Sequence, residues 1–235
     1  MTQIDVTAAD GHVFSMYRAD PDGPRRGAVV VLQEIFGVNG HIRSVCDRLA
    51  ALGYVAAAPA LFDRVSRGYE TGYAPEDVQS GLALMKDFDL DAALRDVAAA
   101  VNALQDEGPV SVMGFCLGGS LAYRIATQDA RVASAACYYG GLIERFSDAA
   151  PLCPVRLFYG AEDPTISAEN VATVRRKQPD LPVHVFPAGH GFSCDSRPAF
   201  DPDAAIIAWT ISMRMIDEVS IQSATDVAAA TETDT

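Results

Sequence analysis

The sequence has little positive charge. It carries 18 Lys and Arg against 31 Asp and Glu, a formal net charge of −13 over 235 residues. Nucleic-acid binders need a basic surface that neutralises phosphates, and the longest basic run here is Arg175-Arg176-Lys177. The same deficit disfavours adhesion to an anionic membrane. We therefore expect neither nucleic acid nor a membrane as a partner, whereas a small anionic substrate stays compatible because one local Arg can outweigh the overall charge.

Long apolar runs and paired cysteine motifs are also missing. No segment has the length and continuity of a transmembrane helix. The first residues lack a basic stretch followed by an apolar run, so no secretory signal is expected. Five cysteines without a Cys-x-x-Cys pair are interpreted as reduced thiols. We predict a cytoplasmic protein, and both a monomer and a small homo-oligomer fit the sequence.

Short apolar strands alternate with amphipathic helices along the chain. Ala28–Gln33 is a β-branched run typical of a strand buried on both faces, and Gly40–Leu52 has the apolar spacing of a helix. This alternation predicts an α/β fold of the α/β-hydrolase type, with a mostly parallel central sheet and helices on both faces. The length suits one domain over residues 1–219, and the polar residues 220–235 are expected to form a disordered tail.

The expected elements follow from the same periodicity. Residues 61–74 are expected to form a long surface loop, and residues 75–104 a helical region with a break near Asp87–Asp91. The other expected strands are Thr2–Val6, Val13–Arg18, Tyr54–Ala58, Val110–Met113, Val132–Tyr139, Val155–Tyr159 and Val183–Phe186, and the other expected helices are Leu117–Thr127, Ala168–Gln178 and Ala204–Asp217.

The most informative segment is Gly114-Phe-Cys116-Leu-Gly118, which lies between a predicted strand and a predicted helix. A nucleophile flanked by glycines at such a turn is typical of hydrolases, because side chains two positions away would collide with the neighbouring strand and helix. The turn places the thiol above the carboxyl end of the sheet, next to the Leu117 N–H at a helix N-terminus. The alternative is that Cys116 is a small buried residue and the glycines serve packing alone.

Two later segments end in an acid and in a histidine. Asp163 follows one predicted strand, and the Gly-flanked His190 follows the next. Nucleophile, acid and base in this order match the α/β-hydrolase triads, and a Cys–His pair oriented by an acid is a recognised nucleophilic device. Taken alone, each residue has an alternative interpretation: Asp163 as a turn cap and His190 as a structural loop histidine. Glu162 is a neighbouring acid that the spacing from Gly160 disfavours.

A metal-centre interpretation would use His184, His190 and Cys194. The strand parity turns His184 away from the site, and the spacing matches no standard zinc pattern. We therefore expect no metal and no cofactor.

The chain resembles the dienelactone hydrolase family of α/β-hydrolases from about Ala28 to Met215. The combination of Gln-Glu-Ile-Phe-Gly with Gly-x-Cys-x-Gly-Gly is specific, whereas either motif alone is not. The matching segments are Gln33–Gly37, Gly114–Gly119, Tyr138–Gly140, Gly160–Asp163, Ala188–Phe192, Asp195–Phe200, Ala204–Ala205 and Ala208–Trp209.

The resemblance implies a role for each matching residue. Cys116 is implied as the nucleophile, His190 as base and then acid, and Asp163 as the residue that orients His190. Glu34 matches an extra acid that contacts the resting thiol and helps to control its ionisation. A carboxylate directly after a buried apolar run is costly unless it is paired or lies at a site, so the alternative for Glu34 is a structural ion pair.

The resemblance also implies how the substrate is held. The backbone N–H groups of Ile35 and Leu117 are the implied oxyanion donors. Well-known members bind a substrate carboxylate with Arg residues at two positions. This sequence has no Arg at either matching position, and the second one is Cys194. Arg197 is the candidate replacement.

Other residues complete the expected pocket. Arg64 and Arg67 are further candidates for the missing Arg, while a structural or surface role is the alternative for every Arg considered. Phe36 and Tyr69, together with Tyr73, are candidates to line the pocket, although the loop of residues 61–74 is equally an ordinary surface loop.

The sequence thus predicts a hydrolase of small esters or lactones that works through a Cys-His-Asp triad and a thioester acyl-enzyme. A non-hydrolytic small-ligand binder or a thiol redox sensor on the same fold is the alternative, because fold does not determine function and a reactive thiol is easily oxidised. A third interpretation is a relative of serine-type carboxylesterases and peptidases, which the cysteine at the turn disfavours.

Overall fold

The computed structural model describes residues 2–233, without the side chains of 224 and 226–233. Its centre is an eight-stranded sheet of order β1-β2-β4-β3-β5-β6-β7-β8. The strands are β1 (Thr2–Thr7), β2 (Val13–Ala19), β3 (Ala28–Leu32), β4 (Val55–Pro59), β5 (Val110–Phe115), β6 (Val132–Tyr138), β7 (Val155–Gly160) and β8 (Val183–Phe186). The helices are α1 (Gly40–Ala51), α2 (Pro75–Leu84), α3 (Leu90–Ala103), α4 (Leu117–Ala126), α5 (Ile143–Phe146), α6 (Ala168–Lys177) and α7 (Pro202–Thr233), with 3₁₀ turns η1 (Leu61–Arg64) and η2 (Gln105–Glu107).

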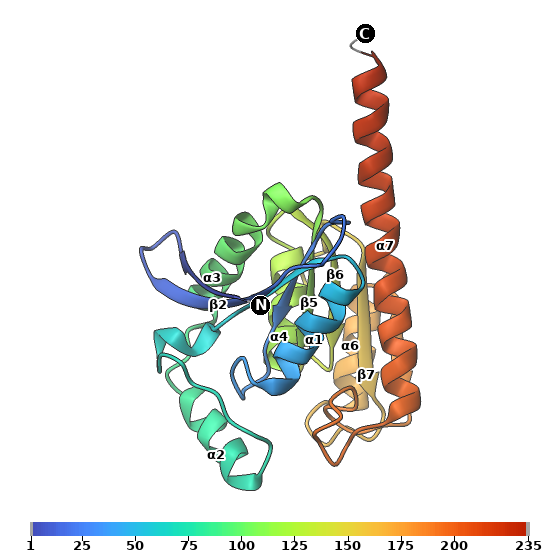
Figure 1. The fold of residues 1–235 in the computed structure, drawn as a ribbon. Helices are drawn as coiled ribbons and strands as arrows, with labels where there is room; N and C mark the ends of the chain where they lie inside the picture. The colour runs from blue at the N-terminus through green and yellow to red at the C-terminus, as the bar shows by residue number, and fades with distance from the viewer. Residues whose placement is uncertain (1, 234–235) are drawn as a thin grey trace.

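The sheet is parallel from β4 to β8, and only β1 and β2 are antiparallel additions at one edge. Helices α1 and α7 pack on one face, while α3, α4 and α6 cover the other (Figure 1). Every residue of β3, β4 and β5 is buried, as a strand covered on both faces requires. These observations confirm the predicted mostly parallel α/β architecture.

The strand order reverses at β3, which pairs with β4 on one side and β5 on the other. The chain leaves β3 toward α1 on one face and leaves β5 toward α4 on the opposite face. The connections therefore diverge at the carboxyl ends of these two strands. Ligands of open α/β sheets bind in the crevice that such a divergence creates.

The C-terminal segment differs from the prediction. A disordered tail was expected from residue 220, whereas the structure continues α7 as helix to Thr233 (Figure 1). Residues 203–233 contain neither Pro nor Gly and are rich in Ala, the strongest helix former. Ser220 is buried and donates a hydrogen bond to the Ile216 carbonyl. A scarcity of large apolar residues favours disorder, but the helix propensity of alanine favours a continued helix here. Residues 234–235 lie outside the described chain.

The segment of residues 61–74 is less exposed than expected. It opens with η1, in which Leu61, Phe62 and Asp63 are buried. The Asp63 carboxylate accepts hydrogen bonds from the backbone N–H groups of Ser15 (2.9 Å) and Gly68 (2.8 Å). This part of the predicted surface loop is therefore a structural element. The predicted helix break at Asp87–Asp91 is confirmed, since α2 ends at Leu84 and α3 begins at Leu90.

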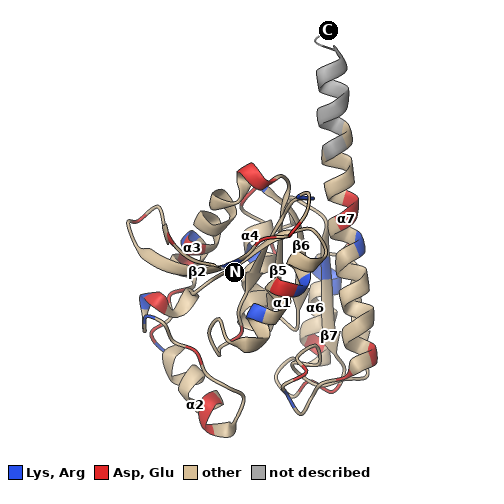
Figure 2. Ribbon diagram, in the orientation of Figure 1, with Lys and Arg blue, Asp and Glu red and all other residues tan. Residues whose placement is uncertain are grey.

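Charged residues are distributed over many elements. Figure 2 shows Lys and Arg interspersed with Asp and Glu along the ribbon. Among the residues that the structure describes, no helix is both long enough and apolar enough to cross a membrane.

The turn from β5 into α4 requires glycine because neighbouring backbone approaches very closely. A Cβ added at Gly114 would lie 2.0 Å from the Gly118 carbonyl oxygen. A Cβ at Gly118 would lie 2.2 Å from the Leu32 carbonyl oxygen, and one at Gly119 would lie 2.3 Å from that of Tyr138. The glycines thus allow α4 to begin directly against β3 and β6.

We expect Gly114→Ala to destabilise the protein by about 3 kcal/mol or more, or to prevent folding, because the backbone must move apart to admit the methyl group. Denaturant unfolding measures the loss. Gly40→Ala is the matched control, since a Cβ there meets nothing within 4 Å; it should stay within about 1 kcal/mol of the parent. Equal effects of the two substitutions would contradict the steric explanation.

Candidate active site

Cys116 occupies a strained backbone position between β5 and α4. Its φ of 54° and ψ of −110° are unusual for a residue that carries a side chain. The Cys116 N–H donates to the Tyr138 carbonyl (3.0 Å), and the Gly118 N–H donates to the Gln33 carbonyl (2.9 Å). These bonds tie the turn to β6 and to the end of β3. The thiol is therefore presented, partly exposed, at the carboxyl edge of the sheet.

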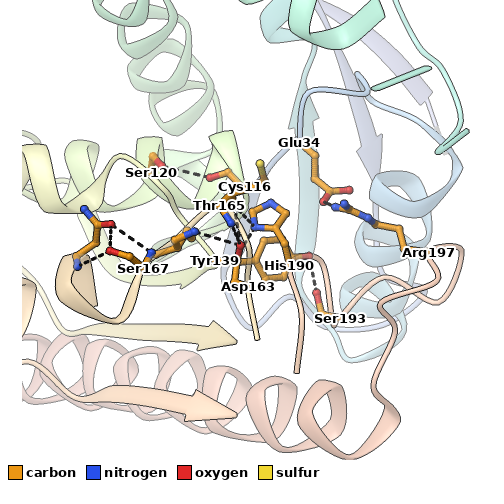
Figure 3. Close-up of polar contacts among 12 residues, drawn as sticks. Glu34, Cys116, Ser120, Tyr139, Asp163, Thr165, Ser167, His190, Ser193 and Arg197 are labelled. Carbon is orange, nitrogen blue, oxygen red and sulfur yellow. Dashed lines mark hydrogen bonds and ion pairs between the residues drawn. The ribbon is translucent and has the colours of Figure 1, made fainter. Parts of the chain in front are cut away.

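His190 and Asp163 form a short hydrogen bond. The His190 Nδ1 donates to the Asp163 Oδ2 at 2.6 Å, and the Cys116 side chain lies next to the imidazole (Figure 3). Burial lowers the pKa of His190, but its interactions with Asp163 and Cys116 outweigh burial and raise that pKa to about 10. Burial raises the pKa of Asp163, whereas the bonds from His190 and Thr165 outweigh burial and lower it. The three sequence-predicted residues thus lie together, with an imidazole whose environment favours its protonated form.

Thr165 is a site residue that the sequence analysis missed. Its N–H and its hydroxyl each donate to the Asp163 Oδ1 at 2.7 Å, and the hydroxyl lies 3.2 Å from the His190 Nδ1. An Asp that caps its own turn typically bonds the N–H two residues later, so the Asp-Pro-Thr sequence carried a signal for this contact. The Asp163 carboxylate therefore does both things: one oxygen caps its own turn, and the other pairs with His190.

Tyr139 was also missed as a site residue. It has a positive φ of 37°, its ring centroid lies 5.0 Å from that of His190, and its hydroxyl is 2.8 Å from the Ser193 Oγ. Tyr139 thereby joins the end of β6 to the segment that carries His190. The Tyr-Tyr-Gly motif marked this position, but only the fold shows what the ring contacts.

Glu34 lies directly after β3 and is 1% exposed. Its Oε1 accepts a hydrogen bond from the Arg197 Nη1 at 2.9 Å, and Figure 3 shows this pair beside Cys116 and His190. The Glu34 Oε2 has no hydrogen-bond partner among the described residues. One oxygen is therefore neutralised by a guanidinium while the other stays free at the site.

Arg197 is held above two aromatic rings. Its guanidinium carbon lies 5.6 Å from the centre of the Phe36 ring and 5.7 Å from that of Tyr73, and these two rings are 4.7 Å apart. A Cβ at Gly191 would lie 2.4 Å from the Arg197 Nη1, so this glycine, at φ +85°, also makes room for the guanidinium. The two predicted residues Arg197 and Phe36 are thus brought together near the thiol.

The other Arg candidates are engaged elsewhere. Arg64 binds the buried Asp96 carboxylate with two bonds of 2.7 Å and also contacts Asp10. Arg67 pairs with the exposed Asp5 at 3.1 Å. Of the three Arg residues considered from the sequence, Arg197 is the one that the fold places beside Glu34.

The structure places Tyr69 away from this cluster. Its hydroxyl donates to the Ser80 Oγ (3.1 Å), its ring packs 5.5 Å from Phe62, and it lines a separate cavity with Val38 and Arg43. Tyr73, four residues later, is the tyrosine beside Phe36 and Arg197. The Gly68 N–H, directly before Tyr69, donates to the Asp63 carboxylate and holds the start of this segment.

Ile35 and Leu117 occupy neighbouring positions at the site. Ile35 follows the end of β3, and Leu117 is the first residue of α4, whose N–H lacks an acceptor within the helix. The bond from the Gly118 N–H to the Gln33 carbonyl holds these two segments together. This arrangement suits a pair of backbone donors directed at one oxygen.

The metal set considered from the sequence is not assembled. His184 lies on β8, where its ring stacks 5.4 Å from Phe158. Within the described chain, the group that could hold a metal consists instead of His41, Cys194 and Asp195.

Comparison with known proteins identifies the family. A model of the dienelactone hydrolase family matches residues 14–220. The chain belongs to the dienelactone hydrolase family. Membership classifies it as an ester or lactone hydrolase, as the motifs predicted, and agrees with the α/β-hydrolase architecture described above.

Individual relatives of this family member cover most of its length. A candidate carboxymethylenebutenolidase of Synechocystis is 34% identical over 201 residues, 77% of this chain and 81% of the relative. The carboxymethylenebutenolidase of Pseudomonas sp. strain P51 is 32% identical over 228 residues, 91% of this chain and 93% of the relative. The crystal structure of a candidate dienelactone hydrolase from Klebsiella pneumoniae superposes with a TM-score of 0.77 at 26% identity, covering 92% of this chain and 98% of that one.

The pKa of His190 generates a prediction about stability. A group whose pKa is about 10 when folded and about 6.5 when unfolded stabilises the protein fully below pH 6.5 and loses this contribution as the pH rises toward 10. We expect the free energy of unfolding to fall by up to about 1.4 kcal/mol per pH unit in this range relative to His190→Gln. Chemical denaturation of both proteins from pH 6 to pH 10 measures it, and parallel curves would contradict the assignment.

The Glu34–Arg197 pair generates a second prediction. Arg197→Met should destabilise the protein by about 3–5 kcal/mol, because it leaves a buried carboxylate unpaired. Adding Glu34→Gln should restore most of the loss, which a double-mutant cycle measures by denaturant unfolding. Arg67→Met is the matched control: its exposed pair with Asp5 should be worth less than about 1 kcal/mol. A loss at Arg197 no larger than at Arg67 would argue against a buried ion pair.

Proposed function

We propose that this protein hydrolyses small esters or lactones by nucleophilic attack of the Cys116 sulfur. The observation that carries the proposal is the 2.6 Å bond between His190 and Asp163 next to a cysteine held in a strained turn. An oriented imidazole beside a thiol can keep the sulfur ionised and can later transfer protons. The membership in a hydrolase family supports the same chemistry.

The reaction proceeds in two halves. The Cys116 thiolate attacks the carbonyl carbon, and the oxygen that becomes negative is stabilised by the N–H groups of Ile35 and Leu117. Collapse of the adduct breaks the carbon–oxygen bond of the ester, and His190 donates a proton to the departing alkoxide. His190 then removes a proton from water, which attacks the thioester and releases the acid and the thiolate. Asp163 stabilises the imidazolium in both halves.

Glu34 and Arg197 are proposed to adjust this site to its substrate. The Glu34 Oε2 is free to interact with the resting thiol and influence its ionisation. The Arg197 guanidinium is suited to a substrate carboxylate, in competition with Glu34, while Phe36 and Tyr73 provide apolar contacts. The relatives that are named carboxymethylenebutenolidases support a lactone with an acidic group as the substrate class.

A thiol sensor or a ligand binder is less consistent with this geometry. Neither function needs a half-buried histidine that is hydrogen-bonded to an aspartate, whose other oxygen accepts a hydrogen bond from Thr165. The cost of burying these groups is explained by catalysis, in which imidazole and carboxylate act in sequence.

Replacing the nucleophile tests the proposal. Cys116→Ala should lower kcat/KM for a chromogenic short-chain ester at least about a thousandfold while the protein stays folded, because no covalent intermediate can form. Cys153→Ala, which removes another incompletely buried free thiol, is the matched control and should retain activity. Mass spectrometry of the parent after rapid quenching should find the acyl group on Cys116. Full turnover by Cys116→Ala would refute the proposed role.

A further inference from the structure

A second group of reactive side chains lies close to the candidate active site but is not used by the proposed reaction. It consists of His41 near the start of α1 and of Cys194 and Asp195 in the segment after His190. One ligand atom from each residue lies within 4.8 Å of the other two. Cys194 is buried, whereas Asp195 is exposed, so the group extends from the interior to the surface.

A buried nitrogen of this group lacks a partner. The His41 Nε2 is buried without a hydrogen-bond partner among the described residues. The Tyr73 hydroxyl lies against the Cys194 thiol and near the Asn39 side chain. An unsatisfied buried polar group costs about 1–3 kcal/mol, and such groups in native proteins call for an explanation. A bound ion that takes the imidazole nitrogen and the sulfur as ligands would remove this cost.

Two of the three side chains reach a solvent-connected cavity, whereas Cys194 is buried. His41 and Asp195 line a cavity of about 210 Å³. Its walls come from α1, from the start of α7 and from residues 193–202, with Phe115 and Tyr138 at its base. The cavity supplies an entry path and leaves room for a water molecule as a further ligand.

The donor set selects the kind of ion. Imidazole nitrogen, thiolate sulfur and carboxylate oxygen are the three donor types that proteins offer to zinc, whereas magnesium and calcium prefer oxygen alone. Three protein ligands with one open position match a four-coordinate zinc centre. Zinc ligands lie roughly 3.5 Å apart given metal–ligand distances of about 2.0–2.3 Å, so the side chains must close by about 1 Å.

We propose that His41, Cys194 and Asp195 bind one zinc ion beside the active site. Binding replaces the S–H bond of Cys194 by a zinc–sulfur bond and releases the proton to solvent. The Tyr73 hydroxyl is placed to donate a hydrogen bond to the metal-bound sulfur.

Zinc at this position would couple to the neighbouring ion pair. The Arg197 N–H donates to the Cys194 carbonyl (3.1 Å), and the Arg197 side chain binds Glu34. Ligation by His41 would attach this segment to α1. Zinc should therefore raise the melting temperature of the protein, since a ligand that binds only the folded state stabilises it.

The test uses the full chain after treatment with a chelator. Titration with Zn²⁺ against a chromogenic chelator should give one site per chain, and Co²⁺ should produce the absorption bands of thiolate–cobalt ligation. Cys194→Ser, His41→Ala and Asp195→Asn should each weaken binding by about tenfold or more. Cys194→Ser should also abolish the thiolate–cobalt bands and the rise in melting temperature. Far-UV circular dichroism verifies that each variant is folded.

Two controls separate this site from other places where zinc binds. His184→Ala removes another histidine whose Nε2 is buried without a partner, and it should leave the affinity unchanged. Cys116→Ala removes the proposed nucleophile and should retain both the affinity and the cobalt bands. The proposal is overturned if no stoichiometric binding is found, if Cys194→Ser binds as the parent does, or if Cys116→Ala abolishes binding. None of these outcomes depends on hydrolase activity.

Discussion

The close approach of α4 to the ends of β3 and β6 is the constraint on which the site depends. Glycines at 114, 118 and 119 allow backbone to meet backbone there, and the chain between them has to pass through a strained conformation at Cys116. The strain is maintained by hydrogen bonds to Gln33, directly after β3, and to Tyr138, the last residue of β6. The backbone conformation directs this side chain away from the core, and the thiol is therefore partly exposed.

Two carboxylates with different partners then determine the charge around the thiol. Asp163 faces an imidazole and a threonine hydroxyl, which use both of its oxygens. Glu34 faces a guanidinium with one oxygen and leaves the other free. The first carboxylate thus has both oxygens occupied, whereas the second keeps one oxygen without a hydrogen-bond partner among the described residues. Such a division of roles between neighbouring acids is set by environment rather than by residue type.

Most of the sheet could be predicted from hydrophobic periodicity, which is a local signal. The glycine-flanked cysteine and the residues after two strands pointed to Cys116, Asp163 and His190, which the fold brings together. The path of the loop before α2 could not be predicted. This loop places Tyr73 beside Arg197 and packs Tyr69 against Phe62. The sequence also did not show Thr165 and Tyr139 against His190, because these contacts depend on how separate segments meet. The C-terminal segment is helical because alanine is a strong helix former, a property that the scarcity of large apolar residues does not reveal.

Glu34 and Arg197 are 163 residues apart in sequence, and they meet only when the segment before α7 docks on the end of β3. A nascent chain leaving the ribosome therefore exposes its first buried acid long before the matching cation has been synthesised. Contacts of such high sequence separation form late, since the intervening loop must first lose its entropy. The Glu34–Arg197 pair therefore cannot form before Arg197 has been synthesised, and a polypeptide that stops short of this residue lacks the pair.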